Sequence, residues 1–247
     1  MLSTVSRAAA FAVAILYAAL GAILFIAPGW ASANFAWNVS PMVAMTIGGW
    51  CLGNAWAAFG AGLRWRLGLV ASALLYLGMC GIFETVVLLA FVDRLRLEHW
   101  LGWLYLAALA VNLVAAILWL VDWLRNRPSM TFQARRIGPF GIALIALFVL
   151  LVAFLGLYGV LAPEGARGLS GTIFPERMSM FTLRAFGAFY LAIALAPLLL
   201  LATRDFDLSL SHMALSWGAL LFITISAFAF IDVFDFAGRP LQYIYIG

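Results

Sequence analysis

Long apolar segments recur along the whole chain and are separated by short connections that carry most of the charged residues. A helix needs ~20 consecutive apolar residues to cross the hydrocarbon core of a bilayer. Seven segments reach this length, at residues 8–27, 41–63, 67–92, 100–121, 138–162, 178–203 and 208–231. Lipid offers no hydrogen bonds to a bare backbone, so we predict an all-α fold, a polytopic transmembrane helical bundle.

The composition excludes a water-soluble globule. Of the 247 residues, 66% are hydrophobic and 10% are charged, which leaves too little polar surface to cover a soluble domain. A formal net charge of +4 could suggest nucleic acid, but the arginines lie singly or in pairs between apolar runs instead of forming a stripe. We therefore expect membrane lipids as partners and no nucleic acid.

The second half of the chain repeats landmarks of the first half at an offset of about 135 to 140 residues. The sequence APG at 27–29 corresponds to APE at 162–164, FVD at 91–93 to FID at 230–232, and LGWLY at 101–105 to LQYIY at 241–245. Four crossings per unit return the chain to the same side, so the two four-helix repeats are predicted to be parallel. Residues 241–247 begin like an eighth span and are too few to complete it, so we expect the eighth helix to be truncated.

The repeat also predicts the domain boundaries. The first repeat takes residues 1–124, an arginine-rich linker takes 125–137, and the second, incomplete repeat takes 138–247. The predicted side that holds the N-terminus and the linker has eight arginines and the other side has five, which predicts a cytoplasmic N-terminus. All 14 basic residues are arginine, as in proteins of GC-rich bacteria, so we expect a bacterial inner-membrane protein.

The N-terminal segment has features of a secretory signal, with Arg7 before an apolar run and Ala31-Ser32-Ala33 after it. The apolar core of a signal peptide usually has about 7 to 15 residues, and this run is longer. We therefore expect the segment to stay in the membrane as the first span, with cleavage as the open alternative.

Polar side chains at membrane depth form the candidate site. Glu84 and Arg184 each lie roughly 9 to 12 Å below the same predicted boundary, at about 1.5 Å of rise per residue, so they could form an ion pair between the repeats. Two interpretations stay open: a site for a solute or proton at which Glu84 titrates, or a pair that only holds the halves in register. If Arg184 instead reaches the headgroups, Glu84 is left alone and protonated. Asn54 and Asn112 complete the candidate site, since amides bond neighbouring helices in membranes.

The sequence contains no catalytic or cofactor-binding motif. G-x-S-x-G, H-E-x-x-H and G-x-x-x-x-G-K are all missing. Cys51 and Cys80 are isolated, and His99 and His212 lie at opposite predicted boundaries, so these residues do not form a metal or haem site together. We predict no enzyme, no catalytic residue and no cofactor or metal.

These observations predict an accessory, scaffold or apolar-ligand-binding membrane protein, with other membrane protein subunits as partners. The alternative is a small-solute or proton-coupled transporter that uses Glu84 and Arg184 at the repeat interface. Each remains an interpretation of residue types and their depth in the predicted spans.

Two short stretches resemble a known group of proteins. FAW at 35–37 with Pro41, and the T-x-R-A-x-G-A stretch at 182–188, are similar to uncharacterised bacterial multi-pass membrane proteins built from a duplicated four-helix unit. The second unit departs from this pattern, because Phe174-Pro175 stands where a Trp-containing match is expected. The resemblance implies a fold and no activity.

Overall fold

The computed structural model describes residues 2–64, 66–128, 135–162 and 173–246. Within these ranges, seven spans are long and apolar enough to cross a membrane. They are α1 (Thr4–Ile26), α3 (Pro41–Leu63), α4 (Leu67–Ala90), α5 (Trp100–Asn126), α6 (Pro139–Leu161), α7 (Met180–Leu195) with α8 (Leu198–Thr203), and α9 (Phe206–Ala229). The chain is therefore an integral membrane protein, and the predicted all-α multi-span fold is confirmed.

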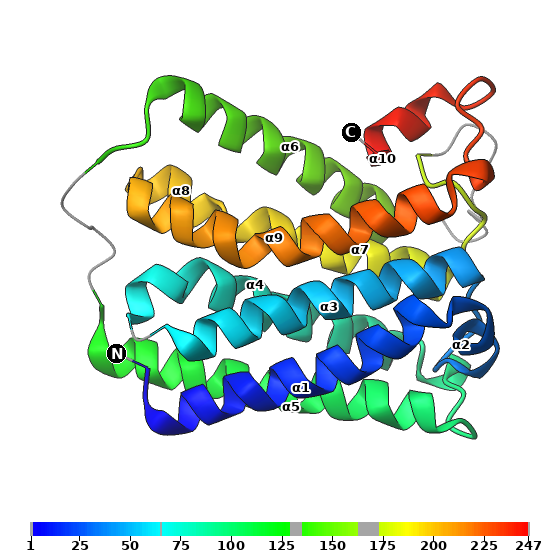
Figure 1. Cartoon of the computed structure of the whole chain (residues 1–247), viewed down its shortest axis with the longest axis horizontal. Coiled ribbons are helices and arrows are strands. Elements are labelled where there is room, and N and C mark those ends of the chain that lie inside the picture. The colour runs from blue at the N-terminus through cyan, green and yellow to red at the C-terminus, as the bar shows by residue number, and fades with distance from the viewer. Residues whose placement is uncertain (1, 65, 129–134, 163–172, 247) are drawn as a thin grey trace.

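The spans run side by side, and their connections lie at two ends of the bundle (Figure 1). One end, here called the N-terminal end, holds the start of α1 and the connections from α3 to α4 and from α8 to α9. The opposite end holds five short helices. They are α2 (Pro28–Asn34), η1 (Val92–Arg94), η2 (Ile231–Val233), η3 (Pro240–Gln242) and α10 (Tyr243–Ile246).

Serine side chains set where several spans begin. The hydroxyl oxygens of Ser3, Ser40 and Ser179 accept hydrogen bonds from the backbone N–H three residues later, which satisfies one free donor of α1, α3 and α7. Pro41 occupies the first turn of α3, where a missing N–H has no consequence. Pro197 acts differently: it removes a backbone donor inside the predicted segment 178–203, and the span is divided there into α7 and α8.

Several pairs of spans approach closely at glycines, among them α1 with α3 and α6 with α7. A Cβ added to Gly48 of α3 would lie 2.7 Å from the backbone N of Phe25 in α1, and one added to Gly21 would lie 2.9 Å from the Gly48 carbonyl oxygen. In the same way, a Cβ added to Gly187 of α7 would lie 2.5 Å from the backbone N of Val160 in α6. Small residues that let backbones meet are the usual basis of helix packing in lipid.

Aromatic rings join α3 and the loop before it to α7. Trp50 of α3 stacks on Phe189 of α7 with ring centroids 4.0 Å apart, and Trp37 stacks on Phe181 at 4.4 Å. The indole N–H of Trp37 also donates to Thr182 Oγ1 at 3.1 Å. These contacts place α7 in the interior, between the early spans and α6.

The predicted linker differs in detail from the structure. Arg125 belongs to the last turn of α5, which continues about one turn past the predicted end at residue 121. At the other end of the linker, Ile137 N–H donates to the Arg204 carbonyl at 2.9 Å and Phe206 N–H donates to the Arg135 carbonyl at 3.0 Å. Residues 129–134 of the linker lie outside the described part of the chain.

Candidate functional site: a polar cluster beside an apolar groove

Arg184 lies in the second turn of α7 and points to the end of α6. Its Nη1 donates to the Gly159 carbonyl oxygen at 2.9 Å and its Nη2 to the Ala162 carbonyl oxygen at 2.6 Å. The last carbonyls of a helix have no partner within that helix, so a guanidinium there replaces missing hydrogen bonds. Among the described residues, no ion pair joins Arg184 to Glu84, so the structure does not bring these two candidates together.

Glu84 lies on the inner face of α4 and is half-buried. Its Oε1 atom is buried and has no hydrogen-bond partner among the described residues. The titratable side chains that interact with it electrostatically come from four spans: Tyr17 of α1, Cys51 of α3, Tyr76 and Cys80 of α4, and Tyr105 of α5. We call Glu84 and these side chains, together with Asn54 and Asn112, the polar cluster. It contains one carboxyl group and no basic side chain.

Asn54 ties α3 to α4 at one side of the cluster. Its Oδ1 accepts a hydrogen bond from the Tyr76 hydroxyl, and its Nδ2 lies 3.9 Å from Cys80 Sγ. All three side chains are buried. Asn54 therefore joins α3 to α4 through its side-chain amide.

Asn112 ties α5 to α4 at the other side. Its Nδ2 donates to the Leu77 carbonyl oxygen at 2.9 Å, and this close approach depends on Gly81, whose added Cβ would lie 2.7 Å from the same nitrogen. Asn112 Oδ1 and the Tyr105 hydroxyl are buried without a hydrogen-bond partner among the described residues. Sequence reasoning missed Tyr17, Tyr76 and Tyr105, although Tyr105 lies two helical turns from Asn112 on the same face.

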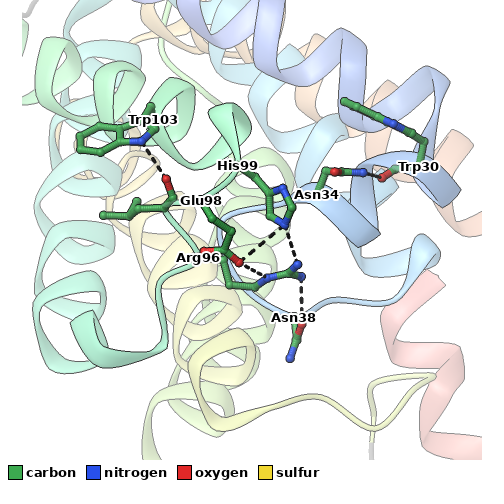
Figure 2. Close-up of polar contacts among 8 residues, drawn as sticks. Trp30, Asn34, Asn38, Arg96, Glu98, His99 and Trp103 are labelled. Carbon is green, nitrogen blue, oxygen red and sulfur yellow. Dashed lines mark hydrogen bonds and ion pairs between the residues drawn. The ribbon is translucent and has the colours of Figure 1, made fainter.

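A second polar network closes the opposite end of the bundle (Figure 2). Arg96 donates from Nη1 to Asn38 Oδ1 at 3.1 Å and from Nε to Glu98 Oε1 at 3.2 Å, and its Nη2 lies 2.7 Å from His99 Nε2. The pKa of Glu98 is lowered, first by its own backbone N–H and then by the Arg96 guanidinium. Each of the three guanidinium nitrogens of Arg96 has a partner, so this network holds the loop before α5 against the loop before α3.

An apolar groove of about 480 Å³ lies between α6 and α9, with further lining from α3, α4 and α7. Leu147 of α6 and Leu220 of α9 lie on its two sides, and Ile244 of α10 also contributes to it. Figure 1 shows α6 diverging from α9 toward the N-terminal end. Its volume is in the range of ligand-binding sites, and its lining is mostly hydrocarbon. Tyr76 lines the groove and also belongs to the polar cluster, so the two features are neighbours.

No group of three or more His, Cys, Asp or Glu side chains that could hold a metal ion occurs in the described ranges. Comparison with known proteins found no matching family, no similar curated protein and no similar solved structure. The likeness to duplicated four-helix membrane proteins therefore stays a prediction, and the function has to be inferred from the groove and the cluster.

Proposed function

We propose that this protein is an accessory membrane subunit that holds a transmembrane helix of another subunit in the groove between α6 and α9. The groove is the observation that carries this proposal. It offers hydrocarbon side chains over much of its surface, as a helix in lipid requires, and contains no acid or arginine among its lining residues. The proposal includes no catalysis.

Features of the structure support the predicted parallel repeats. The contact between α1 and α3 at Gly21 and Gly48 has a counterpart between α6 and α7 at Gly159 and Gly187, at the offset predicted from the sequence. In addition, α4 is followed by η1 and α9 by η2, each after a single phenylalanine cap. The repeat pairs α1 with α6, α3 with α7 and α4 with α9.

This pairing suggests what fits the groove. In the first unit, α5 packs against both α1 and α4. The corresponding helices, α6 and α9, have few contacts with each other and border the groove instead. A helix bound there would pack against the second unit as α5 packs against the first, at the place that the repeat predicts for an eighth helix. The crosslinking test below therefore distinguishes a helix of another subunit from a segment of this protein itself.

Photo-crosslinking from inside the groove tests the proposal. Benzoylphenylalanine at Leu147 faces the groove, and the same residue at Leu150 is the control, since Leu150 is similarly exposed on α6 and does not line the groove. We expect Leu147, and not Leu150, to crosslink to an apolar helix of a second protein in native membranes. Adducts only to lipid, or only to this protein itself, would contradict an accessory role.

The second candidate function is transport of a small solute or of protons. It is supported by Glu84, an acid at membrane depth without a basic partner among the described residues. Arg184 does not support it, because its guanidinium is held by the carbonyls of α6. In a transporter, Glu84→Gln would abolish pH-dependent uptake into vesicles, whereas an accessory subunit would keep its partner in the same variant.

We also propose that the N-terminal end faces the cytoplasm of a bacterium. Arg7, Arg64, Arg66, Arg125 and Arg127 lie at or near this end, which agrees with the excess of arginine in cytoplasmic loops. A membrane-impermeant maleimide should label Asp93→Cys and not Arg125→Cys in cells with a permeabilised outer membrane. The native Cys51 and Cys80 are buried, so we expect no labelling of these two thiols by the maleimide. The reverse labelling pattern would invert the orientation.

A further inference from the structure

The register between α4 and α5 places Glu84 and Tyr105 at one depth. The hydrogen bond from Asn112 to the Leu77 carbonyl sets these antiparallel helices side by side. Glu84 lies two turns beyond Leu77 along α4, and Tyr105 lies two turns before Asn112 along α5. Because the two helices are antiparallel, Glu84 and Tyr105 therefore lie at the same depth. Tyr105 also interacts electrostatically with Glu84.

Two oxygen atoms at this level, Glu84 Oε1 and Tyr105 Oη, lack hydrogen-bond partners among the described residues, and so does Asn112 Oδ1 two turns away. Tyr105 is 7% exposed and Asn112 is not exposed at all. Leaving a buried polar group unsatisfied costs about 1 to 3 kcal/mol, so three together in one part of the bundle point to an occupant. A proton on Glu84 would remove the charge from this buried carboxyl group.

The charges around Glu84 also favour a protonated carboxyl group. The titratable groups facing it from α1, α3, α4 and α5 are phenols and thiols, which are neutral at pH 7. α4 also packs against α7 and α9, whose basic side chains are Arg184, bound to the end of α6, and His212 near the N-terminal end. None of these neutralises a carboxylate, and an isolated buried carboxylate is strongly unfavourable.

We infer that Glu84, with Tyr105 at the same depth, forms an intramembrane proton-binding site. The Glu84 side chain is half-buried, so part of it reaches the surface of the bundle, where an apolar reagent dissolved in lipid can meet it. The inference stands apart from the groove, and holds whether the protein is an accessory subunit or a transporter.

Dicyclohexylcarbodiimide, an apolar reagent that modifies protonated carboxyl groups, provides the test. The carboxyl oxygen adds to the carbodiimide carbon, the carboxyl proton moves to nitrogen, and rearrangement gives a stable N-acylurea. The purified full-length protein in lipid nanodiscs is treated across a pH series, with and without Na⁺, and the adduct is located by peptide mass spectrometry. Glu98 in the exposed network is the internal control, and Glu84→Gln is the site control.

We expect the adduct at Glu84 at neutral pH and little at Glu98. Labelling should fall about tenfold for each pH unit above the point where Glu84 loses its proton, and Na⁺ should have no effect. Absence of an adduct at every pH would overturn the inference, because the wild-type carboxyl itself is the reporter. Protection by Na⁺ at constant pH would also overturn it, since the occupant would then be a metal cation.

Discussion

Arg184 is a charged residue that satisfies its hydrogen bonds without an acid. Its guanidinium lies in an apolar bundle beside the last carbonyls of α6, and two of those oxygens accept its N–H groups. Backbone oxygens of a neighbouring helix end thus take the place that the sequence suggested for Glu84. Arg184 therefore joins α7 to α6 and does not pair with Glu84, which belongs to the polar cluster.

The first prediction concerns this contact. Arg184→Met should destabilise the protein by about 1 to 3 kcal/mol, because two carbonyls at the end of α6 lose charged donors. Arg184→Lys is the matched control, since one ammonium keeps the charge and only part of the geometry, and its effect should be intermediate. Thermal unfolding in lipid nanodiscs measures both variants. Equal stability of wild type and Arg184→Met would show that the contact contributes nothing.

The second prediction concerns pH and Glu98. Because the pKa of Glu98 is lowered in the folded protein, its contacts stabilise the fold above the unfolded-state pKa and are lost as pH falls through the lower, folded-state value. Glu98→Gln should therefore lower the melting temperature slightly at neutral pH, and the difference from wild type should vanish in acid, below the lowered folded-state pKa.

Melting curves of both proteins between neutral and acid pH check this prediction. Asp93→Asn is the control, since it changes an exposed pair with Arg94 in the same loop and should leave the melting temperature unchanged. A difference between wild type and Glu98→Gln that persists in acid would contradict the assigned role of the charge.

At the scale of residues, the sequence identified part of the site. Glu84, Asn54 and Asn112 could be selected because polar side chains at membrane depth need partners. Their partners could not be predicted, because several are backbone oxygens or tyrosine hydroxyls on other spans. Tyrosine is common in membrane helices, so Tyr105 gave no signal until the register of α4 and α5 was known.

Among the helices, glycine contacts determine how closely several spans approach. An added Cβ would lie 2.7 Å from a backbone nitrogen of α1 at Gly48 and 2.5 Å from one of α6 at Gly187, and no side-chain rotation can relieve either contact. Helix position was largely predictable, since the predicted segment 41–63 matches α3. The helix α2 was missed because seven residues carry too little periodicity, and the break at Pro197 because the surrounding residues are uniformly apolar.

The third prediction uses these glycines. Gly48→Val and Gly187→Val should each destabilise the protein by about 1 to 3 kcal/mol or more, because α1 or α6 must move away from its partner. Gly29→Ala in α2 is the control, because an added Cβ there meets no atom within 4 Å. The fraction of folded protein recovered after reconstitution and the melting temperature both report the effect. If Gly48→Val matched Gly29→Ala, the close contact between α1 and α3 would be refuted.

Across the whole molecule, the spans differ in how closely they pack. α5 packs against both α1 and α4, whereas an apolar groove lies between α6 and α9. Figure 1 shows α6 and α9 diverging toward the N-terminal end. The sequence predicted the number and order of the spans. A groove depends on how the spans pack, and hydropathy gives no information about packing.

The proposed accessory role rests on this groove, and a groove-filling variant tests it. Leu147→Trp with Leu220→Trp places two indole rings inside the groove and should exclude a bound helix. Leu150→Trp adds the same ring to an exposed position of α6 outside the groove and should have no effect. Both variants keep apolar side chains at positions that face lipid, so the protein should still insert into the membrane.

Native mass spectrometry of the protein, gently extracted from its own membranes, is the most direct measurement. The account predicts a second membrane protein in fixed ratio with the wild type and with Leu150→Trp, and its loss from the double variant. A lone protomer or homo-oligomer that carries only lipid, unchanged by the two tryptophans, would contradict it.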